Sequence, residues 1–416
     1  MLKRGLLLFL LYFSLLTGAE PKTVSIGEAV SIKSFGAVGD GITDDTLAIQ
    51  KAINSSTKLL FPKGRYKISK SIYPRSDTVL ISDHATLYYT KEYGVAELWP
   101  AFYFEKNIHH VKMLGHWIFE GDSPHSAFNR ATAGPDDSYV EGVKIKTGCS
   151  DIYIESLEGF HFTAGVMEIG ADHPYNQSSR NIRVDKFKAY DCWNAALAIT
   201  SGFDIHFKEI ETFGIVSNPN YAQIGFDIEV NSRGDKLRNI RIDKVVTHDN
   251  EIGFQVLAKS REQRGITIGS LISYDNRDNG INLLDVTNVH IHNAEVYNNG
   301  GAGLFLEGSF RNIIIEKGSL HNNRNHGVLA QMEGREEIAA PSENLQLGID
   351  IYNNHDHGIL LSGTDLYPVK KFVFSGSVYN NQEAKTQLTG IDVRKNVSDI
   401  NISGEVYGNT FYQIRK

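Results

Sequence analysis

The chain has 416 residues, with 42 lysines and arginines against 49 aspartates and glutamates, and a formal net charge of −7 at pH 7. This mildly acidic balance argues against general binding of nucleic acid or of anionic membrane surfaces. Two cysteines, Cys149 and Cys192, are too few for a disulfide framework. We favour two small buried residues, although the pair could bond in an oxidising compartment.

The first 19 residues resemble a secretory signal peptide. Lys3 and Arg4 precede an apolar run from Leu6 to Leu16, and small residues follow, ending at Ala19. The run is shorter than the about 20 apolar residues that span a bilayer. We therefore expect a secreted protein, extracellular or periplasmic, that is cleaved near Ala19 and is not inserted in a membrane. The remaining chain has 40 cations and 49 anions, a net charge of −9.

Residues 34–53, SFGAVGDGITDDTLAIQKAI, form the first recognisable structural motif. The pattern predicts a strand, a glycine-rich turn and a short amphipathic helix whose start is marked by Asp44 and Asp45. Such an acidic run could hold calcium. We favour instead a helix that covers the exposed end of a stack of strands.

The second half of the chain repeats one phrase at intervals of 23 to 31 residues. The copies are HDNEIGFQV (from 248), YDNRDNGINLL (274), YNNGGAGLFL (297), HNNRNHGVLA (321), YNNHDHGILL (352) and YNNQEAKTQLTGIDV (379). This period, with short β-branched strands and Asn-rich turns, predicts stacked β coils in one elongated all-β solenoid domain over residues 20–416. We expect the turn asparagines to be structural, because Asn tolerates left-handed backbone and its amide bonds neighbouring backbone groups.

The motif at Phe35 to Ile53 and the repeats resemble the pectate lyase-like superfamily. This superfamily of secreted right-handed parallel β-helices includes polygalacturonases, rhamnogalacturonases, carrageenases, alginate epimerases and phage tailspikes. The resemblance covers nearly the whole chain after the signal peptide. It implies a single-stranded right-handed parallel β-helix with a short N-terminal capping helix, and it says little about the reaction, because members differ in chemistry.

A column of outward side chains identifies the candidate site. Aligning the coils on the glycine that opens each strand makes the next residue inward and the one after it outward. The first outward column then runs Glu168, Ala198, Asp227, Gln255, Asn282, Phe305, Leu329, Leu360 and Asp392. In its middle, GFDIEVN (225–231) places Asp227 and Glu229 on one face, at a Cα separation of roughly 6.5 to 7 Å. We take these two acids as candidate catalytic residues and Glu168, Gln255 and Asn282 as candidate substrate contacts.

Longer insertions interrupt the repeat beside this patch, at 121–142, 170–180, 216–224 and 258–265. Insertions in a solenoid fall at coil corners and can wall a groove. Further candidate substrate contacts are His173, Tyr175, Trp193, Tyr221, Lys259, Arg261 and Arg264. The cations suit carboxylate or sulfate groups, and ordinary solubilising surface cations are the equally weighted alternative. Trp193 could stack on a sugar ring, with core packing as its alternative.

The paired carboxyl groups indicate glycoside hydrolysis. Repulsion between close carboxylates raises the pKa of one of them, which separates the acid from the base. A spacing of roughly 6.5 to 7 Å lies at the inverting end of the range, where a water fits between base and sugar. We expect a carbohydrate-active enzyme that degrades an acidic polysaccharide by inversion, with Glu229 as acid and Asp227 as base, or the reverse.

Comparison with individual families leaves other reactions open. The polygalacturonase motifs are missing, since NHGV (325–328) and DHGI (356–359) resemble Gly-His-Gly only superficially. Iota-carrageenases are similar in having a carboxylate-x-carboxylate strand, in the order Glu-x-Asp. Alginate C5-epimerases resemble the chain at Gly225 to Asp227, within a Tyr-Gly-Phe-Asp-Pro-His-Glu stretch.

The match to the epimerases is incomplete. Ile224 stands where they have Tyr, and Ile228-Glu229 where they have Pro-His. A polysaccharide lyase or C5-epimerase acting on a uronate-containing glycan would therefore need Tyr221, His173 or Lys259 for its chemistry. It is the first alternative, and a non-catalytic polysaccharide-binding β-helix is the second. No Cys-x-x-Cys or His-x-x-x-His pattern occurs, so we expect no metal and no other cofactor, although calcium stays possible.

Overall fold

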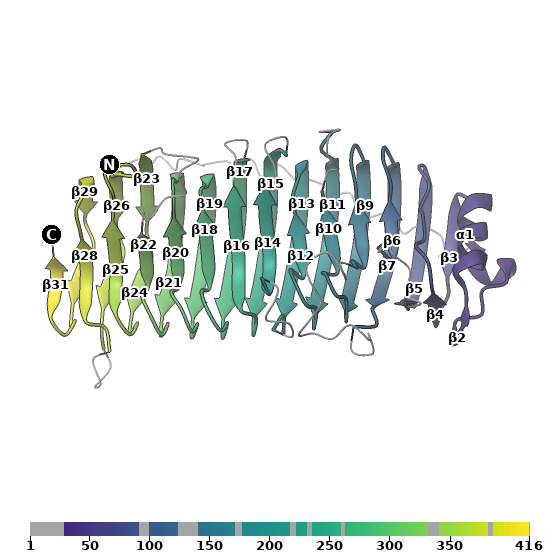
Figure 1. Cartoon of the computed structure of the whole chain (residues 1–416), viewed down its shortest axis with the longest axis horizontal. Helices are drawn as coiled ribbons and strands as arrows, with labels where there is room; N and C mark the ends of the chain where they lie inside the picture. The colour runs from purple at the N-terminus through teal and green to yellow at the C-terminus, as the bar shows by residue number, and fades with distance from the viewer. Residues whose placement is uncertain are drawn as a thin grey trace, which may run out of the picture.

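The computed structural model describes residues 29–90, 100–123, 140–170, 177–216, 222–230, 235–258, 263–331, 341–381 and 386–415. The predicted signal peptide lies outside these residues. The described chain winds into coils that stack along one long axis, from helix α1 (Thr46–Ser55) at one end to strand β31 (Tyr412–Arg415) at the other (Figure 1). Strands of successive coils pair in parallel, which confirms the predicted all-β solenoid with one short helix.

Two parallel sheets form the walls of the described coils. The 12-stranded sheet contains β6 (Phe102–Phe104), β8 (Val143–Ile145), β10 (Met167–Ile169), β12 (Leu197–Ile199), β14 (Ile224–Val230), β16 (Ile252–Ala258), β18 (Ile281–Leu284), β20 (Leu304–Glu307), β22 (Val328–Gln331), β25 (His357–Ser362), β28 (Thr389–Val393) and β31.

The second sheet has 19 strands within the described ranges. They are β1 (Val30–Ser31), β2 (Asp40–Asp44), β3 (Lys58–Phe61), β4 (Gly64–Ile68), β5 (Thr78–Tyr89), β7 (His109–Glu120), β9 (Ser150–Phe160), β11 (Arg180–Tyr190), β13 (Gly202–Phe213), β15 (Leu237–His248), β17 (Gln263–Tyr274), β19 (Thr287–Tyr297), β21 (Arg311–His321), β23 (Ser342–Leu347), β24 (Asp350–Tyr352), β26 (Val369–Phe374), β27 (Ser377–Tyr379), β29 (Val397–Ile402) and β30 (Glu405–Tyr407).

Helix α1 and the 3-10 helix η2 (Ile32–Phe35) occupy the N-terminal end of the stack (Figure 1). The carboxylate of Asp45 accepts hydrogen bonds from the backbone N–H groups of Val38 (2.7 Å) and Gly39 (3.0 Å). Asp44 accepts one from the N–H of Thr46, the first helical residue, at 2.9 Å. These acids bond the backbone of the turn and the start of the helix, in agreement with the structural role that we favoured.

The repeated asparagines are structural. The second residue of the first five copies has left-handed backbone, with φ between 54° and 58° at Asp249, Asp275, Asn298, Asn322 and Asn353. In these five copies the third residue is buried, and its side-chain oxygen accepts the backbone N–H of the residue at the same position one coil earlier. These acceptors are Asn250, Asn276, Asn299, Asn323 and Asn354. Both physical reasons for Asn at the turn therefore apply, one at each position.

The inside of the coils is apolar, and both cysteines lie there as buried thiols that are not joined in a disulfide. The residue that begins each copy of the phrase is aromatic, and these rings stack from coil to coil with centroid distances of 4.6 to 5.1 Å. The stacked residues are His248, Tyr274, Tyr297, His321, Tyr352 and Tyr379. In the described part of the chain, no helix has the length and apolarity that crossing a membrane requires.

Candidate functional site

Strand pairing confirms the predicted outward column on the 12-stranded sheet. Asp227 of β14 lies between Ala198 and Gln255 of the neighbouring coils, and Ala198 lies beside Glu168. The flanking residues Phe226 and Ile228 are fully buried inside the coil, so Asp227 and Glu229 project outward. The same column continues through Asn282, Phe305, Leu329, Leu360 and Asp392, in the order expected.

Gly225 brings strand β14 close to the asparagine ladder. A Cβ atom there would lie 2.2 Å from Thr247 Oγ1 and 2.7 Å from the carbonyl oxygen of Gly253. Only glycine fits this contact without displacement, because real Cβ atoms do not approach so closely. The glycine that opens the strand therefore also fixes where Asp227 and Glu229 leave the sheet.

Three polar side chains form a ladder along the centre of the column. Gln255 donates through Nε2 to Asp227 Oδ1 at 3.2 Å, and Asn282 donates through Nδ2 to Gln255 Oε1 at 3.5 Å. All three are buried, with Asp227 only 5% exposed, while Glu229 is partly exposed. Asn282 Oδ1 has no hydrogen-bond partner among the described residues. The structure thus brings together Asp227, Glu229, Gln255 and Asn282.

Glu168 belongs to a second charged cluster, two coils from Asp227 and therefore roughly 10 Å away at the usual strand spacing. Its carboxylate lies 2.7 Å from Lys144 Nζ, and Lys144 also pairs with Glu141. Burial, opposed by Lys144 and reinforced by the neighbouring Glu168, raises the pKa of Glu141 to about 7. Burial acts the same way on Glu168, but Lys144 and a hydrogen bond with Glu141 hold its pKa below the ordinary value.

Glu141 and Lys144 are site residues that the sequence analysis missed. The sequence pattern could have identified Lys144, because Gly142 precedes β8, Val143 points inward and the next residue, Lys144, therefore points outward. Strand pairing places Lys144 beside Glu168 of the outward column. Glu141 precedes that glycine and follows no outward periodicity. With a pKa of about 7, its carboxyl group is partly protonated at neutral pH, so the cluster can donate a proton as well as bind a polar group.

The remaining candidates lie elsewhere. Trp193 is 0% exposed, so in this structure its ring packs in the protein interior. Arg264 is exposed on β17 of the 19-stranded sheet, level with Arg238, and not on the sheet that carries Asp227. Five candidates on corner insertions lie outside the described residues: His173, Tyr175, Tyr221, Lys259 and Arg261.

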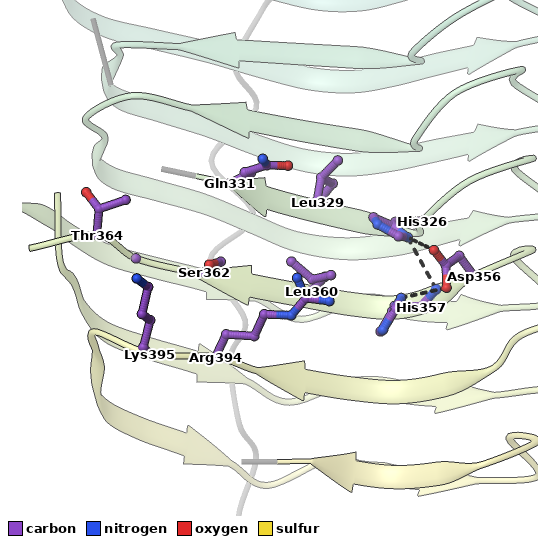
Figure 2. A pocket seen from close by; sticks show the side chains of 11 residues that line it. His326, Leu329, Gln331, Asp356, His357, Leu360, Ser362, Thr364, Arg394 and Lys395 are labelled. Atoms are coloured by element: carbon purple, nitrogen blue, oxygen red, sulfur yellow. Dashed lines mark hydrogen bonds and ion pairs between the residues drawn. The ribbon is translucent and has the colours of Figure 1, made fainter. Parts of the chain in front are cut away.

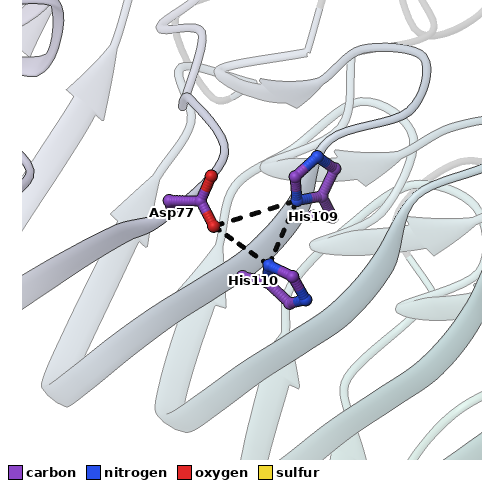
Figure 3. A group of neighbouring side chains, drawn as sticks. All are labelled: Asp77, His109 and His110. Carbon is purple, nitrogen blue, oxygen red and sulfur yellow. Dashed lines mark hydrogen bonds and ion pairs between the residues drawn. The ribbon is translucent and has the colours of Figure 1, made fainter.

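Three groups of histidine and acidic side chains in the described ranges have the spacing of metal ligands. One is Asp77, His109 and His110, with His110 Nδ1 2.9 Å from Asp77 Oδ1 (Figure 3). Another is Glu316 with His290 and His292, at 2.7 and 2.9 Å. The third, around Asp356, lies on the same sheet as Asp227.

Comparison with known proteins gives two family matches. Residues 29–97 match the family described as rhamnogalacturonase A/epimerase, pectate lyase-like, and residues 175–339 match the right-handed β-helix region family. Mannuronan C5-epimerase AlgE5 of Azotobacter vinelandii is 25% identical over 314 residues, which is 73% of this chain and 25% of that protein. This chain spans a quarter or less of the length of the curated relatives that it matches.

Two solved structures share the fold. The A-module of mannuronan C5-epimerase AlgE4 from the same organism has a TM-score of 0.61 at 16% identity, covering 93% of this chain and 97% of that module. Tailspike protein 3 of bacteriophage CBA120 has a TM-score of 0.62 at 12% identity, covering 94% of this chain and 59% of the tailspike. The family matches and the shared fold confirm the resemblance to the pectate lyase-like superfamily and the right-handed parallel β-helix fold.

Proposed function

We propose that this chain is a polysaccharide-acting enzyme and that its reaction takes place around Asp227 and Glu229. The observation that carries the proposal is that two carboxyl groups of β14 face one side in the middle of the 12-stranded sheet, with Gln255 and Asn282 beside them. The similarity to a mannuronan C5-epimerase supports a polysaccharide substrate.

Hydrolysis with inversion is the reaction that the described residues support best. The amide of Gln255 stabilises a negative charge on Asp227, which suits the base that activates a water. Glu229 is more exposed and can protonate the leaving oxygen of the sugar. The strand sets their Cα atoms roughly 6.5 to 7 Å apart on one face. Inversion requires a separation of about 6.5 to 9.5 Å between the two carboxyl groups, which leaves room for that water.

Epimerisation or β-elimination of a uronate is the second candidate, and the named relative favours it. Both reactions need a base for the proton beside the sugar carboxylate and a cation to hold that carboxylate. In the outward column as described, Lys144 is paired with Glu168 and Arg415 with Asp392. Lys259 or Arg261 would have to supply the cation, and for this reason we place hydrolysis first.

A panel of neutral and acidic polysaccharides separates these reactions. New reducing ends without ultraviolet absorbance indicate hydrolysis, and proton NMR of the first products then reports inversion or retention. Absorbance of an unsaturated uronate indicates a lyase, and a changed uronate composition without shorter chains indicates an epimerase. Each activity has to be lost in Asp227→Asn or Glu229→Gln; retention of the polysaccharide without any product would instead establish a binding protein.

A further inference from the structure

A second polar cluster lies on the 12-stranded sheet, towards the C-terminal end of the stack (Figure 2). His326 and His357 each precede the glycine that opens an outward strand, in the stretches NHGV and DHGI. Because Val328 of β22 pairs with Ile359 of β25, the two histidines occupy the same place in adjacent coils. Their ring centroids are 5.0 Å apart. The cluster begins about four coils, or roughly 19 Å, from Asp227.

The carboxylate of Asp356 lies between the two rings. Asp356 Oδ2 is 3.5 Å from His326 Nδ1, and Asp356 Oδ1 is 2.8 Å from His357 Nδ1 (Figure 2). Both histidine side chains are largely buried, at 9% and 12% exposure. His357 Nδ1 makes no hydrogen bond to any described residue despite its short distance to the carboxylate. The contact is an ion pair when the ring is protonated, and a cation bound by both atoms would account for the close approach when it is not.

The other contacts of the two rings indicate that both Nδ1 atoms are unprotonated. His357 Nε2 lies 3.3 Å from Asp392 Oδ2, so the ring proton sits on Nε2, facing a carboxylate that is 1% exposed. A carboxylate on the far nitrogen is the usual partner of a metal-binding histidine. His326 Nδ1 accepts the backbone N–H of His357 in a long contact of 3.3 Å, which requires an unprotonated Nδ1. A metal bound to His326 Nδ1 would replace this hydrogen bond.

Asp392 is itself held in place. Arg394 Nε donates to its Oδ2 at 3.1 Å and Arg415 Nε to its Oδ1 at 2.8 Å, so its charge is balanced without a proton. A pocket of about 360 Å³ opens beside the cluster and is lined by His326, Asp356 and His357 together with Leu360 and Arg394. A metal held by three protein ligands would keep a free coordination position towards this pocket.

We propose that His326, Asp356 and His357 bind one divalent transition-metal ion of the zinc class. Two imidazole nitrogens and one carboxylate oxygen are a ligand set for such ions, whereas calcium and magnesium prefer oxygen ligands throughout. The histidine side chains of the two other groups are 34% to 62% exposed, whereas those of His326 and His357 are 9% and 12% exposed. They serve as internal comparisons, because a more exposed group pays more to order its side chains around an ion.

The test is equilibrium dialysis of the chelator-treated full chain against Zn²⁺, with bound metal measured by elemental analysis. The tightest site is expected to hold one ion per chain and to weaken at least tenfold in His357→Ala and in Asp356→Asn. His355→Ala is the matched control, since His355 is exposed and precedes Asp356 directly. This control and, separately, the double variant His290→Ala/His292→Ala should both bind the metal at the tightest site with unchanged affinity.

Unchanged tight binding in both His326→Ala and His357→Ala would overturn the proposal, as would loss of that binding only in the His290/His292 double variant. Since a variant could misfold, X-ray absorption of the Co²⁺-loaded native chain is the second measurement. It should show two imidazole ligands, and a shell of oxygens alone would contradict the site. Neither experiment uses a polysaccharide, so the outcome is independent of the function proposed for Asp227.

Discussion

Gln255 of one coil donates a hydrogen bond to Asp227 of the preceding coil, at 3.2 Å between Nε2 and Oδ1. The contact crosses two parallel strands whose register is fixed by the buried residues Phe226 and Phe254. A slip of one residue would turn Asp227 into the apolar interior. The stacking that stabilises the coils therefore also aligns the polar ladder of the candidate site.

Replacing either outward acid should remove activity. We expect Asp227→Asn and Glu229→Gln each to lower kcat by about 100-fold or more, the usual contribution of a general acid or base. Glu307→Gln is the matched control, because Glu307 occupies the strand position of Glu229 three coils further along the same sheet. Initial rates on the polysaccharide that gives products in the panel provide the measurement, and equal rates in all three variants would exclude the pair.

Gln255 should act as a positioning residue for Asp227. Gln255→Ala removes a hydrogen bond to a charged group, worth about 1.5 to 3 kcal/mol, so we expect kcat to fall by roughly tenfold or more. A residue that only binds substrate would instead raise KM and leave kcat unchanged. Steady-state kinetics distinguish the two, and unchanged kcat in Gln255→Ala would show that the hydrogen bond has no role in the reaction.

The raised pKa of Glu141 predicts a pH-dependent stability. Burial, together with the neighbouring Glu168 and against Lys144, raises this pKa from 4.5 to about 7 in the folded chain. Between these two values the folded state binds more protons than the unfolded state, so the stabilising effect present below about pH 4.5 is lost as the pH rises to about 7. The glutamine in Glu141→Gln does not titrate. Relative to that variant, the free energy of unfolding of the native chain should fall between about pH 4.5 and 7 and should not change further at higher pH.

Urea midpoints of both proteins from pH 3 to 8 measure that difference. Glu168→Gln provides a comparison of opposite sign, because the pKa of Glu168 is lowered and its contribution disappears as the pH falls below 4.5. If the difference in urea midpoint between the native chain and Glu141→Gln does not change with pH, Glu141 does not have the raised pKa.

The sequence predicts the coils, the outward column and the place of Asp227 and Glu229, because glycine and the alternation of strand residues fix each register locally. Glu141 is missed since it precedes the strand whose alternation reveals Lys144. The proposed metal ligands are missed for another reason. His326 and His357 are 31 residues apart in the chain, and only stacking of coils brings them together. Arg264 lies just after a corner of the coil. Strand alternation predicts which side of a sheet a residue faces, but not whether a residue near a corner belongs to the first or the second sheet.

The buried asparagine ladder gives the clearest prediction for stability. Asn299 Oδ1 accepts two hydrogen bonds from Asn276, one from the backbone N–H at 3.1 Å and one from the side-chain Nδ2 at 2.8 Å. Asn299 Nδ2 in turn donates to Asn323 Oδ1 at 2.9 Å. Asn299→Ala leaves a buried N–H and a buried side-chain amide without these partners. Each unsatisfied group costs about 1 to 3 kcal/mol, so we expect the free energy of unfolding to fall by about 3 kcal/mol or more.

Asn298→Gly is the matched control, because Asn298 is exposed and has left-handed backbone at φ 58°, which glycine adopts without strain. The two adjacent residues of the phrase thus separate the conformational role of asparagine from its hydrogen-bonding role. Denaturant unfolding followed by circular dichroism should show a large loss for Asn299→Ala and little change for Asn298→Gly. Similar losses in both would mean that the ladder contributes no more than the turn, and that apolar stacking of the coils holds the sheet carrying Asp227 in register.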